Sequence, residues 1–136
     1  MKPKAVVYLC AYNNETHQSL INQEAICNKW ADAYDVEIVN VFQDQWVDPK
    51  QRDKVGLQRM IEYLKLHNQD ARVVDYVLIA EVDRLVKVHT ASIPKLLSTV
   101  SKICEEHVTI MDTTEEQNFW IRGYGTVNDV FKGQWR

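Results

Sequence analysis

The sequence Tyr-Val-Leu-Ile-Ala at residues 76–80 decides the fold. An uninterrupted apolar run of this length is typical of a strand that is buried on both faces, as the central strands of parallel sheets are. Further strand-like runs lie at residues 5–10, 36–42 and 108–111. Segments with apolar residues at helical spacing lie at residues 19–34, 57–66 and 92–104. This alternation predicts an α/β fold, a three-layer sandwich in which helices flank a mostly parallel sheet of four or five strands.

Local signals set the expected ends of these elements. Ser19 is the predicted N-cap of the first helix, because a serine hydroxyl can accept a hydrogen bond from a backbone N–H of the first turn. The polar stretch at residues 45–54 contains Pro49 and predicts a loop. Pro94 falls in the first turn of the helix predicted at 92–104, where proline is tolerated.

Length and composition indicate one ordinary globular domain. The 136 residues are 46% hydrophobic and 26% charged, which is enough apolar surface for a single core. No apolar run approaches the roughly 20 residues of a membrane span. The amino-terminal residues lack the pattern of a signal peptide. We therefore expect a cytoplasmic protein with no membrane partner.

The cysteines and histidines show no ligand spacing. Cys10, Cys27 and Cys104 form no CxxC pair, and the four histidines are scattered. We expect buried thiols, no metal site and no cofactor. The formal net charge of −3 lacks the basic excess of a dedicated DNA-binding domain, so we expect weak or no autonomous DNA binding.

Several sequence motifs occur in order at or after the ends of the predicted strands. Tyr8-Leu9-Cys10-Ala11-Tyr12 ends the first strand, and Ser19-Leu20-Ile21-Asn22-Gln23 begins the first helix. Asp44 follows the second strand, before Asp48-Pro49 and Lys54-Val55-Gly56-Leu57. Asp83-Arg84-Leu85-Val86-Lys87 follows the third. In order and spacing these motifs resemble the catalytic domain of the serine recombinases (the resolvase/invertase family) from about residue 4 to residue 113.

The resemblance implies which positions would carry the chemistry. The family's first strand has the form Tyr-x-Arg-Val-Ser, and its serine is the nucleophile. Cys10 stands where the family has its first catalytic arginine, Tyr12 stands at the nucleophile, and Thr16 stands where a glutamine is usual. Asp48-Pro49 replaces a Ser-Gly pair, and Lys54 and Lys87 replace arginines. Asp44, Asp83 and Arg84 match the family's pattern.

These replacements remove what the family's reaction needs. In that reaction a hydroxyl attacks a DNA phosphate, and catalysis is mostly positioning and charge stabilisation. Arginine suits it because its planar fork binds two phosphate oxygens, whereas lysine keeps the charge without the fork. Losing one such donor costs on the order of 10²–10³ in rate. The resemblance therefore implies a degenerate active site and a catalytically inactive domain.

Two interpretations remain for the replaced residues. Tyr12 either fills the former active-site pocket or acts as a nucleophile in a divergent recombinase or nuclease that makes a covalent phosphotyrosine link to DNA. Cys10 is the weaker candidate nucleophile, because it ends a buried strand without a histidine partner in the sequence. Asp83 and Arg84 either anchor their loop, or Arg84 forms a residual phosphate site with Lys54 and Lys87.

The carboxyl-terminal stretch differs in composition from the rest. We divide the chain into a resolvase-like domain at residues 1–114 and a glycine- and aromatic-rich extension at 115–136, with a possible short helix at 127–135. Its aromatic residues either pack on the domain or form a docking patch. They are Phe119, Trp120, Tyr124, Phe131 and Trp135. The length predicts that the family's long helix and separate DNA-binding domain are absent.

Together these features favour a regulatory or protein-interaction module linked to DNA recombination or mobile elements. We expect a homodimer, or a heteromer with an intact recombinase or another regulator.

Overall fold

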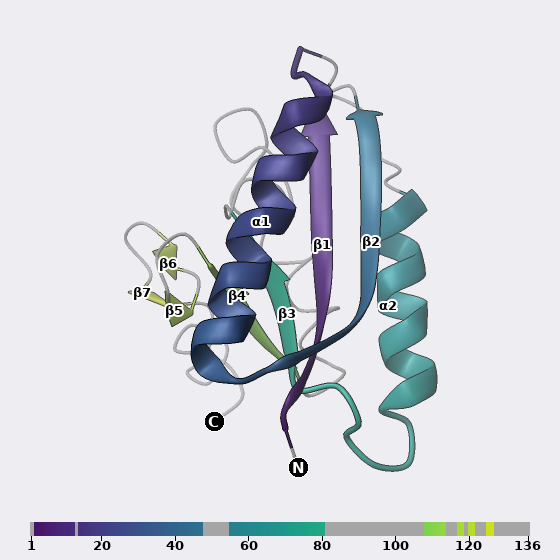
Figure 1. Cartoon of the computed structure of the whole chain (residues 1–136). Coiled ribbons are helices and arrows are strands. Elements are labelled where there is room, and N and C mark those ends of the chain that lie inside the picture. The colour runs from purple at the N-terminus through teal and green to yellow at the C-terminus, as the bar shows by residue number, and fades with distance from the viewer. Residues whose placement is uncertain are drawn as a thin grey trace.

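The computed structural model describes residues 2–12, 14–47, 55–80 and 108–113, together with three short strands between residues 117 and 126 (Figure 1). Its elements are β1 (Lys4–Tyr12), α1 (His17–Tyr34), β2 (Glu37–Val47), α2 (Val55–His67), β3 (Tyr76–Ile79), β4 (Thr109–Asp112), β5 (Gln117–Asn118), β6 (Trp120–Ile121) and β7 (Gly125–Thr126). The four strands predicted from apolar runs and the first two predicted helices are all present in the described part.

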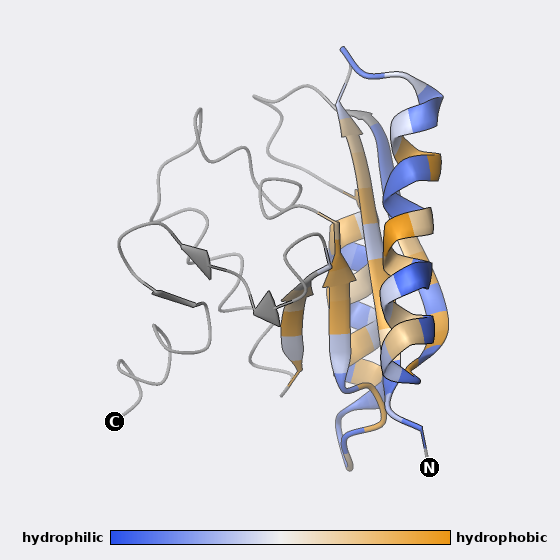
Figure 2. Cartoon of the chain, turned by 60° about the vertical axis from the view of Figure 1, so that its left-hand side comes forward, coloured by the Kyte–Doolittle hydropathy of each residue, from blue (hydrophilic) through white to orange (hydrophobic). Residues whose placement is uncertain are grey.

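The main sheet has the strand order β2-β1-β3-β4-β5. The pairs β1–β2, β1–β3 and β3–β4 are parallel, and β5 adds antiparallel to β4. Strands β6 and β7 form a separate antiparallel pair. Helix α1 covers one face of the sheet and α2 lies on the opposite face (Figures 1 and 2). The predicted α/β architecture, with helices on both faces of a mostly parallel sheet, is confirmed.

Strand β1 is central because it is apolar on both faces. Its alternate side chains enter two separate cores, as the two-residue period of a strand requires. The core on the α2 side holds Val6, Tyr8, Cys10 and Tyr12 of β1, with Leu57, Met60 and Leu64 of α2. The core on the α1 side holds Ala5, Val7, Leu9 and Ala11 of β1, with Leu20, Cys27 and Trp30 of α1. In Figure 2 the strands of the main sheet are mostly hydrophobic, whereas α1 carries both hydrophilic and hydrophobic residues.

Two predicted boundaries are wrong. Helix α1 begins at His17 with Thr16 at the N-cap position, so Ser19 lies inside the helix and is not its N-cap. The Thr16 side chain makes no capping hydrogen bond. Residues 45–47 were predicted to lie in a loop but belong to β2, because β1 continues to Tyr12 and pairs there with Val47. Tertiary pairing thus extends the strand through a polar segment.

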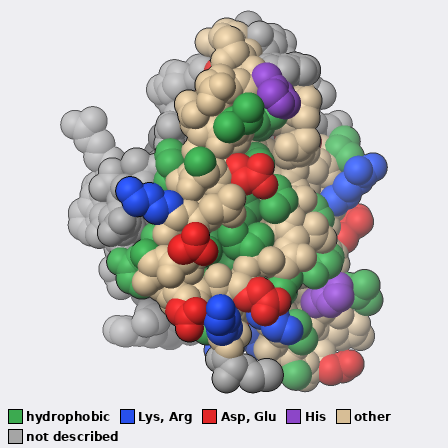
Figure 3. Space-filling view, in the orientation of Figure 1, with side chains coloured by type: hydrophobic (Ala, Val, Ile, Leu, Met, Phe, Trp, Pro, Cys, Tyr) green, Lys and Arg blue, Asp and Glu red, His purple; other side chains and the backbone are tan. Residues whose placement is uncertain are grey.

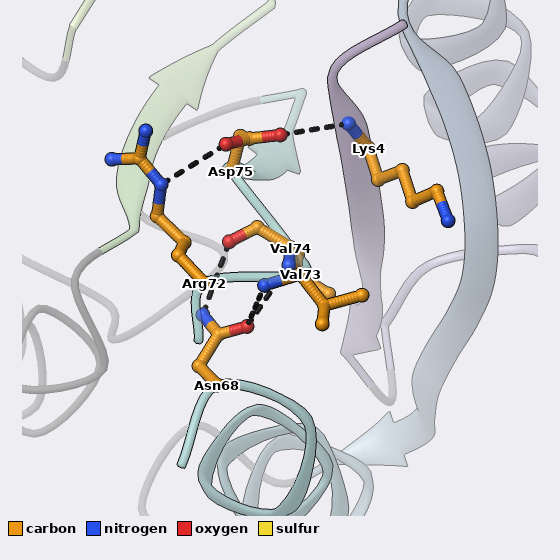
Figure 4. Close-up of polar contacts among 6 residues, drawn as sticks. All are labelled: Lys4, Asn68, Arg72, Val73, Val74 and Asp75. Carbon is orange, nitrogen blue, oxygen red and sulfur yellow. Dashed lines mark hydrogen bonds and ion pairs between the residues drawn. The ribbon is translucent and has the colours of Figure 1, made fainter. Parts of the chain in front are cut away.

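A side-chain clamp closes the connection from α2 to β3 (Figure 4). Asn68 Oδ1 accepts hydrogen bonds from the backbone N–H groups of Val73 (3.0 Å) and Val74 (2.9 Å), and its Nδ2 donates to the Val74 carbonyl (3.0 Å). The Asp75 N–H then donates to the Lys4 carbonyl at 2.8 Å. These hydrogen bonds fix the backbone just before β3 and so position the start of β3 beside β1.

Several predictions lie outside the described residues. They include the helix at 92–104 and the possible helix at 127–135. No helix within the described ranges has the length and apolar character needed to cross a membrane.

Candidate functional site

The carboxyl end of β1 is where the topology places a site. From β1 the chain crosses to β2 on one side of β1, and the next strand, β3, lies on the other side of β1. The direction in which successive strands are added to the sheet therefore reverses at β1. Open α/β sheets bind ligands at the carboxyl ends of strands at such a reversal. Strand β1 pairs with β3 only over residues 5–7, but with β2 as far as Tyr12. Its last residues therefore extend past the end of the β3 pairing.

Beyond the end of the β3 pairing, the side chain of Gln23 makes hydrogen bonds to the backbone of β1 that a neighbouring strand would otherwise make. The Cys10 N–H donates to Gln23 Oε1 at 3.1 Å, and Gln23 Nε2 donates to the Cys10 carbonyl at 3.0 Å. Gln23 is 2% exposed, so both backbone groups of Cys10 would otherwise be buried without these partners. This amide bridge ties the end of β1 to α1.

Glu15 extends the same network to the turn after β1. One carboxylate oxygen, Oε1, accepts the Tyr12 N–H at 3.0 Å, and Oε2 accepts the Ser19 hydroxyl at 2.8 Å. Gln23 Nε2 also lies 3.1 Å from Ser19 Oγ. The side chains of Glu15, Ser19 and Gln23 thus fix the backbone at residues 10–12, where the resemblance places the reactive groups.

We expect Gln23→Leu to lower the free energy of unfolding by about 3 kcal/mol, because it removes two hydrogen bonds to the buried backbone N–H and carbonyl of Cys10. Urea denaturation followed by circular dichroism measures the change. The control is Gln18→Leu on the exposed side of α1, where the side chain donates a hydrogen bond to the exposed Asn22 side chain, and it should cost less than about 0.5 kcal/mol. Equal losses in the two variants would contradict the bridge.

On the α2 side of β1, a buried carboxylate holds the start of a helix. Asp44 is 8% exposed and lies opposite Cys10 in the β1–β2 register. Its Oδ1 accepts the Gly56 N–H at 2.7 Å, and its Oδ2 accepts the Leu57 N–H at 3.0 Å and the Tyr8 hydroxyl at 2.7 Å. The amino end of a helix favours a negative charge. Asp44 therefore pins the first turn of α2 to β1 and β2.

Tyr8 is a hydrogen-bond donor that does not ionise in the folded protein. Burial raises the pKa of its hydroxyl far above the ordinary value, and the neighbouring Cys10 and Asp44 raise it further. In the unfolded chain a tyrosine ionises near pH 10. Because the folded-state pKa is the higher one, this contribution to stability is complete below about pH 10 and is lost as the pH rises above it.

We expect absorbance titration of the phenolates to show that Tyr8 ionises only when the protein unfolds in alkali. Tyr8→Phe should reduce this late step by one phenolate and leave the earlier titration unchanged. A late step of the same amplitude in the variant would contradict the assignment to Tyr8.

Cys10 and Tyr12, the residues of β1 that the resemblance aligns with catalytic positions, are both buried. Tyr12 is 4% exposed and lies in the core with Leu57 and Met60, and Cys10 is fully buried. The sequence left open whether the Tyr12 side chain stands in an open cleft or fills a pocket. Its burial favours a residue that fills space.

Most of the other predicted site residues belong to parts of the chain that the structure does not describe. Asp48, Lys54, Asp83, Arg84 and Lys87 lie outside the described residues, as do Phe119, Tyr124, Phe131 and Trp135. Trp120 is described only as backbone in β6. The residual phosphate site and the aromatic patch therefore stay predictions. Within the described ranges, no group of three or more histidine, cysteine or acidic residues could hold a metal ion.

Sequence reasoning missed the roles of three residues at this site. Gln23 belongs to a motif, but its bonds to β1 were not predicted. Ser19 was predicted as an N-cap and instead bonds Glu15 and Gln23. Glu15 was assigned no role, although it accepts the Tyr12 N–H. The available signal was its position three residues after Tyr12, in a turn closed by the hydrogen bond from Glu15 N–H to the Tyr12 carbonyl.

The fold is shared with solved recombinase domains. The N-terminal catalytic domain of TP901-1 integrase matches with a TM-score of 0.66 at 18% identity, covering 83% of this chain and 78% of that one. The C-terminal catalytic domain of ISC1926 TnpA, an IS607-like serine recombinase, matches with 0.64 at 20% identity, covering 79% and 67%. A resolvase family site-specific recombinase from Streptococcus pneumoniae matches with 0.65 at 21% identity, covering 85% and 74%.

No curated protein matches the chain in sequence. The family described as "Resolvase, N terminal domain" matches residues 7–127, which is most of the chain. This protein belongs to the resolvase family, through the domain that carries catalysis in serine recombinases.

Proposed function

We propose that this domain has lost recombinase catalysis and acts through protein–protein contacts, as a regulatory module in DNA recombination. The observation that carries the proposal is the burial of Tyr12, the residue aligned with the nucleophile. A nucleophile must come within reach of a DNA phosphate, and a tyrosine that is 4% exposed as a whole residue and packs in an apolar core is poorly placed for that.

The electrostatic part of the site supports the same conclusion. Cys10 supplies neither a positive charge nor a fork of donors where the family has an arginine, and its side chain is fully buried beside Tyr8. The lysines at positions 54 and 87 keep charges but not the bidentate geometry. A change of nucleophile alone would leave the phosphate-binding groups in place, whereas here both have changed.

The scaffold around the former site is nevertheless intact. The Gln23 bridge, the Glu15 turn and the Asp44 cap keep β1, α1 and α2 in a fixed arrangement. A domain that keeps its fold and loses its reacting groups retains surfaces through which it could pair with itself or with an intact recombinase. With a net charge of −3, it would reach DNA mainly through such a partner.

The first test is a DNA cleavage assay on nicked substrates that trap covalent protein–DNA adducts. An intact serine recombinase serves as the positive control. We expect no adduct from this protein, and Tyr12→Phe should behave like the parent. An adduct that disappears in Tyr12→Phe would establish the alternative, a divergent recombinase or nuclease acting through Tyr12.

The second test concerns the partner. Light scattering after size exclusion would detect a homodimer. Co-purification with an intact recombinase from the same host would detect a heteromer, and addition of this protein should then change the recombination rate of that enzyme. A monomer that neither binds the enzyme nor alters its rate would contradict the regulatory role.

A further inference from the structure

A cavity lies at the end of the sheet opposite Tyr12. Its volume is about 570 Å³, within the range of pockets that take small molecules. The amino ends of three strands contribute to it, through Lys4 of β1, Tyr76 of β3 and Thr109 of β4. The other described lining residues are Lys2, Pro3, Arg72, Val73 and Asp75. None of these residues belongs to the site at the carboxyl end of β1.

The polar groups of this cavity are mostly hydrogen-bond donors. Its one carboxylate among the described lining residues, Asp75, is already engaged at both oxygens: Oδ1 lies 3.1 Å from Arg72 Nε, and Oδ2 accepts the Lys4 backbone N–H at 3.0 Å (Figure 4). Among the described residues, the terminal guanidinium nitrogens of Arg72 and the hydroxyl groups of Tyr76 and Thr109 make no hydrogen bond. A donor-rich cavity whose acceptors are occupied suits a ligand that brings its own oxygen acceptors.

Arg72 is the group best placed to hold such a ligand. Its Nε lies 3.1 Å from Asp75 Oδ1 and its side chain is 60% exposed, so the outer guanidinium nitrogens are open to an oxyanion that accepts two hydrogen bonds. The Lys4 side chain extends away from Asp75 and from the Arg72 guanidinium, so Lys4 contributes to the wall and not to this contact (Figure 4). Lys2 pairs with Asp35 at 3.1 Å, but both side chains are mostly exposed, and such a pair holds a lysine only weakly.

The lining of the cavity carries more positive than negative side chains, although the whole chain has a net negative charge. Figure 3 shows lysine or arginine side chains beside acidic ones at the lower end of the molecule, near the amino terminus. The cavity itself is lined by three cationic side chains and one carboxylate, in a chain whose net charge is −3. Pro3, Val73 and Tyr76 add apolar surface.

We propose that this cavity binds a small organic oxyanion, with its carboxylate or phosphate group on Arg72 and its apolar body against Pro3, Val73 and Tyr76. The hydroxyl of Thr109 adds a further donor. This site is independent of the regulatory role proposed for the opposite end of the sheet, so either could fail without the other.

The test uses matched probes on the full chain. Phenyl phosphate, benzoate and neutral benzyl alcohol are titrated into ¹⁵N-labelled protein at low salt, and amide shifts are followed by NMR. We expect saturable shifts at Arg72, Val73 and Thr109 with at least one anion, weakened by added salt, and none with the alcohol. The stronger of the two anions identifies the oxyanion. Equal binding of the alcohol, or no saturable shift with either anion, would overturn the proposal.

Variants locate the binding group. Arg72→Gln should weaken binding about tenfold or more, since a charge-assisted bidentate contact is lost. Arg59→Gln, on the exposed side of α2, is the matched control and should bind as the parent does. Thr109→Val, which keeps the side-chain shape, should weaken binding severalfold and serves if Arg72→Gln folds poorly. Parental affinity in the folded Arg72 or Thr109 variant, or equal loss in the Arg59 variant, would also overturn it.

Discussion

Asp44→Ala should lower the free energy of unfolding by about 4 kcal/mol. The substitution removes the acceptor for three buried donors at once, the Tyr8 hydroxyl and the backbone N–H groups of Gly56 and Leu57. Each buried donor left without a partner costs about 1–3 kcal/mol. Because domains of this kind are stable by only about 5–15 kcal/mol, the variant should be close to its unfolding threshold at ordinary temperature.

Two companion variants separate the parts of this contact. Tyr8→Phe removes one donor together with its need for an acceptor, so it should cost only about 1 kcal/mol. Asp44→Asn keeps one acceptor oxygen but places an NH₂ group opposite the remaining donors. Its loss in free energy of unfolding should lie between those of Tyr8→Phe and Asp44→Ala. Urea denaturation of the three variants measures their free energies of unfolding and so tests this order. A loss below about 1 kcal/mol in Asp44→Ala would show that α2 does not depend on this carboxylate.

The sheet was predictable because its signal is strong and local. The apolar runs of β1 and β3 are uninterrupted, and a strand buried on both faces needs such a run wherever it lies in the chain. The same reasoning located α1 and α2 from apolar spacing. It failed at residues 45–47, because the polar residues 43–45 do not end β2 where β1 continues to pair with it as far as Val47.

The site was predictable only in part. The motif around Cys10 and Tyr12 could be placed at the end of a buried strand, and their burial follows from that position. The Gln23 bridge was not foreseeable, because it depends on β1 extending beyond its pairing with β3, a relation between segments about 70 residues apart. Asp44 was noted as a match to a motif, yet its role follows only from where α2 begins.

Gly56→Ala should destabilise the protein by about 2–3 kcal/mol, against the usual effect of that substitution in a helix. Alanine normally stabilises a helical position by about 1 kcal/mol relative to glycine. Here a Cβ at residue 56 would stand 2.3 Å from the Gln43 carbonyl oxygen and 2.7 Å from its carbon, both backbone atoms of β2. A rigid strand cannot yield as a flexible side chain does, so the start of α2 must move away.

That movement would also stretch the hydrogen bonds that Asp44 makes to Gly56 and Leu57, so the two effects share one structural cause. The double variant Asp44→Ala/Gly56→Ala should therefore lose less stability than the two single losses predict when added. Gln58→Ala, two residues further along the exposed side of α2, is the control and should change stability by less than about 0.5 kcal/mol. A stabilised Gly56→Ala protein would mean that α2 does not approach β2 this closely. Additive losses would mean that the carboxylate and the glycine act on α2 separately.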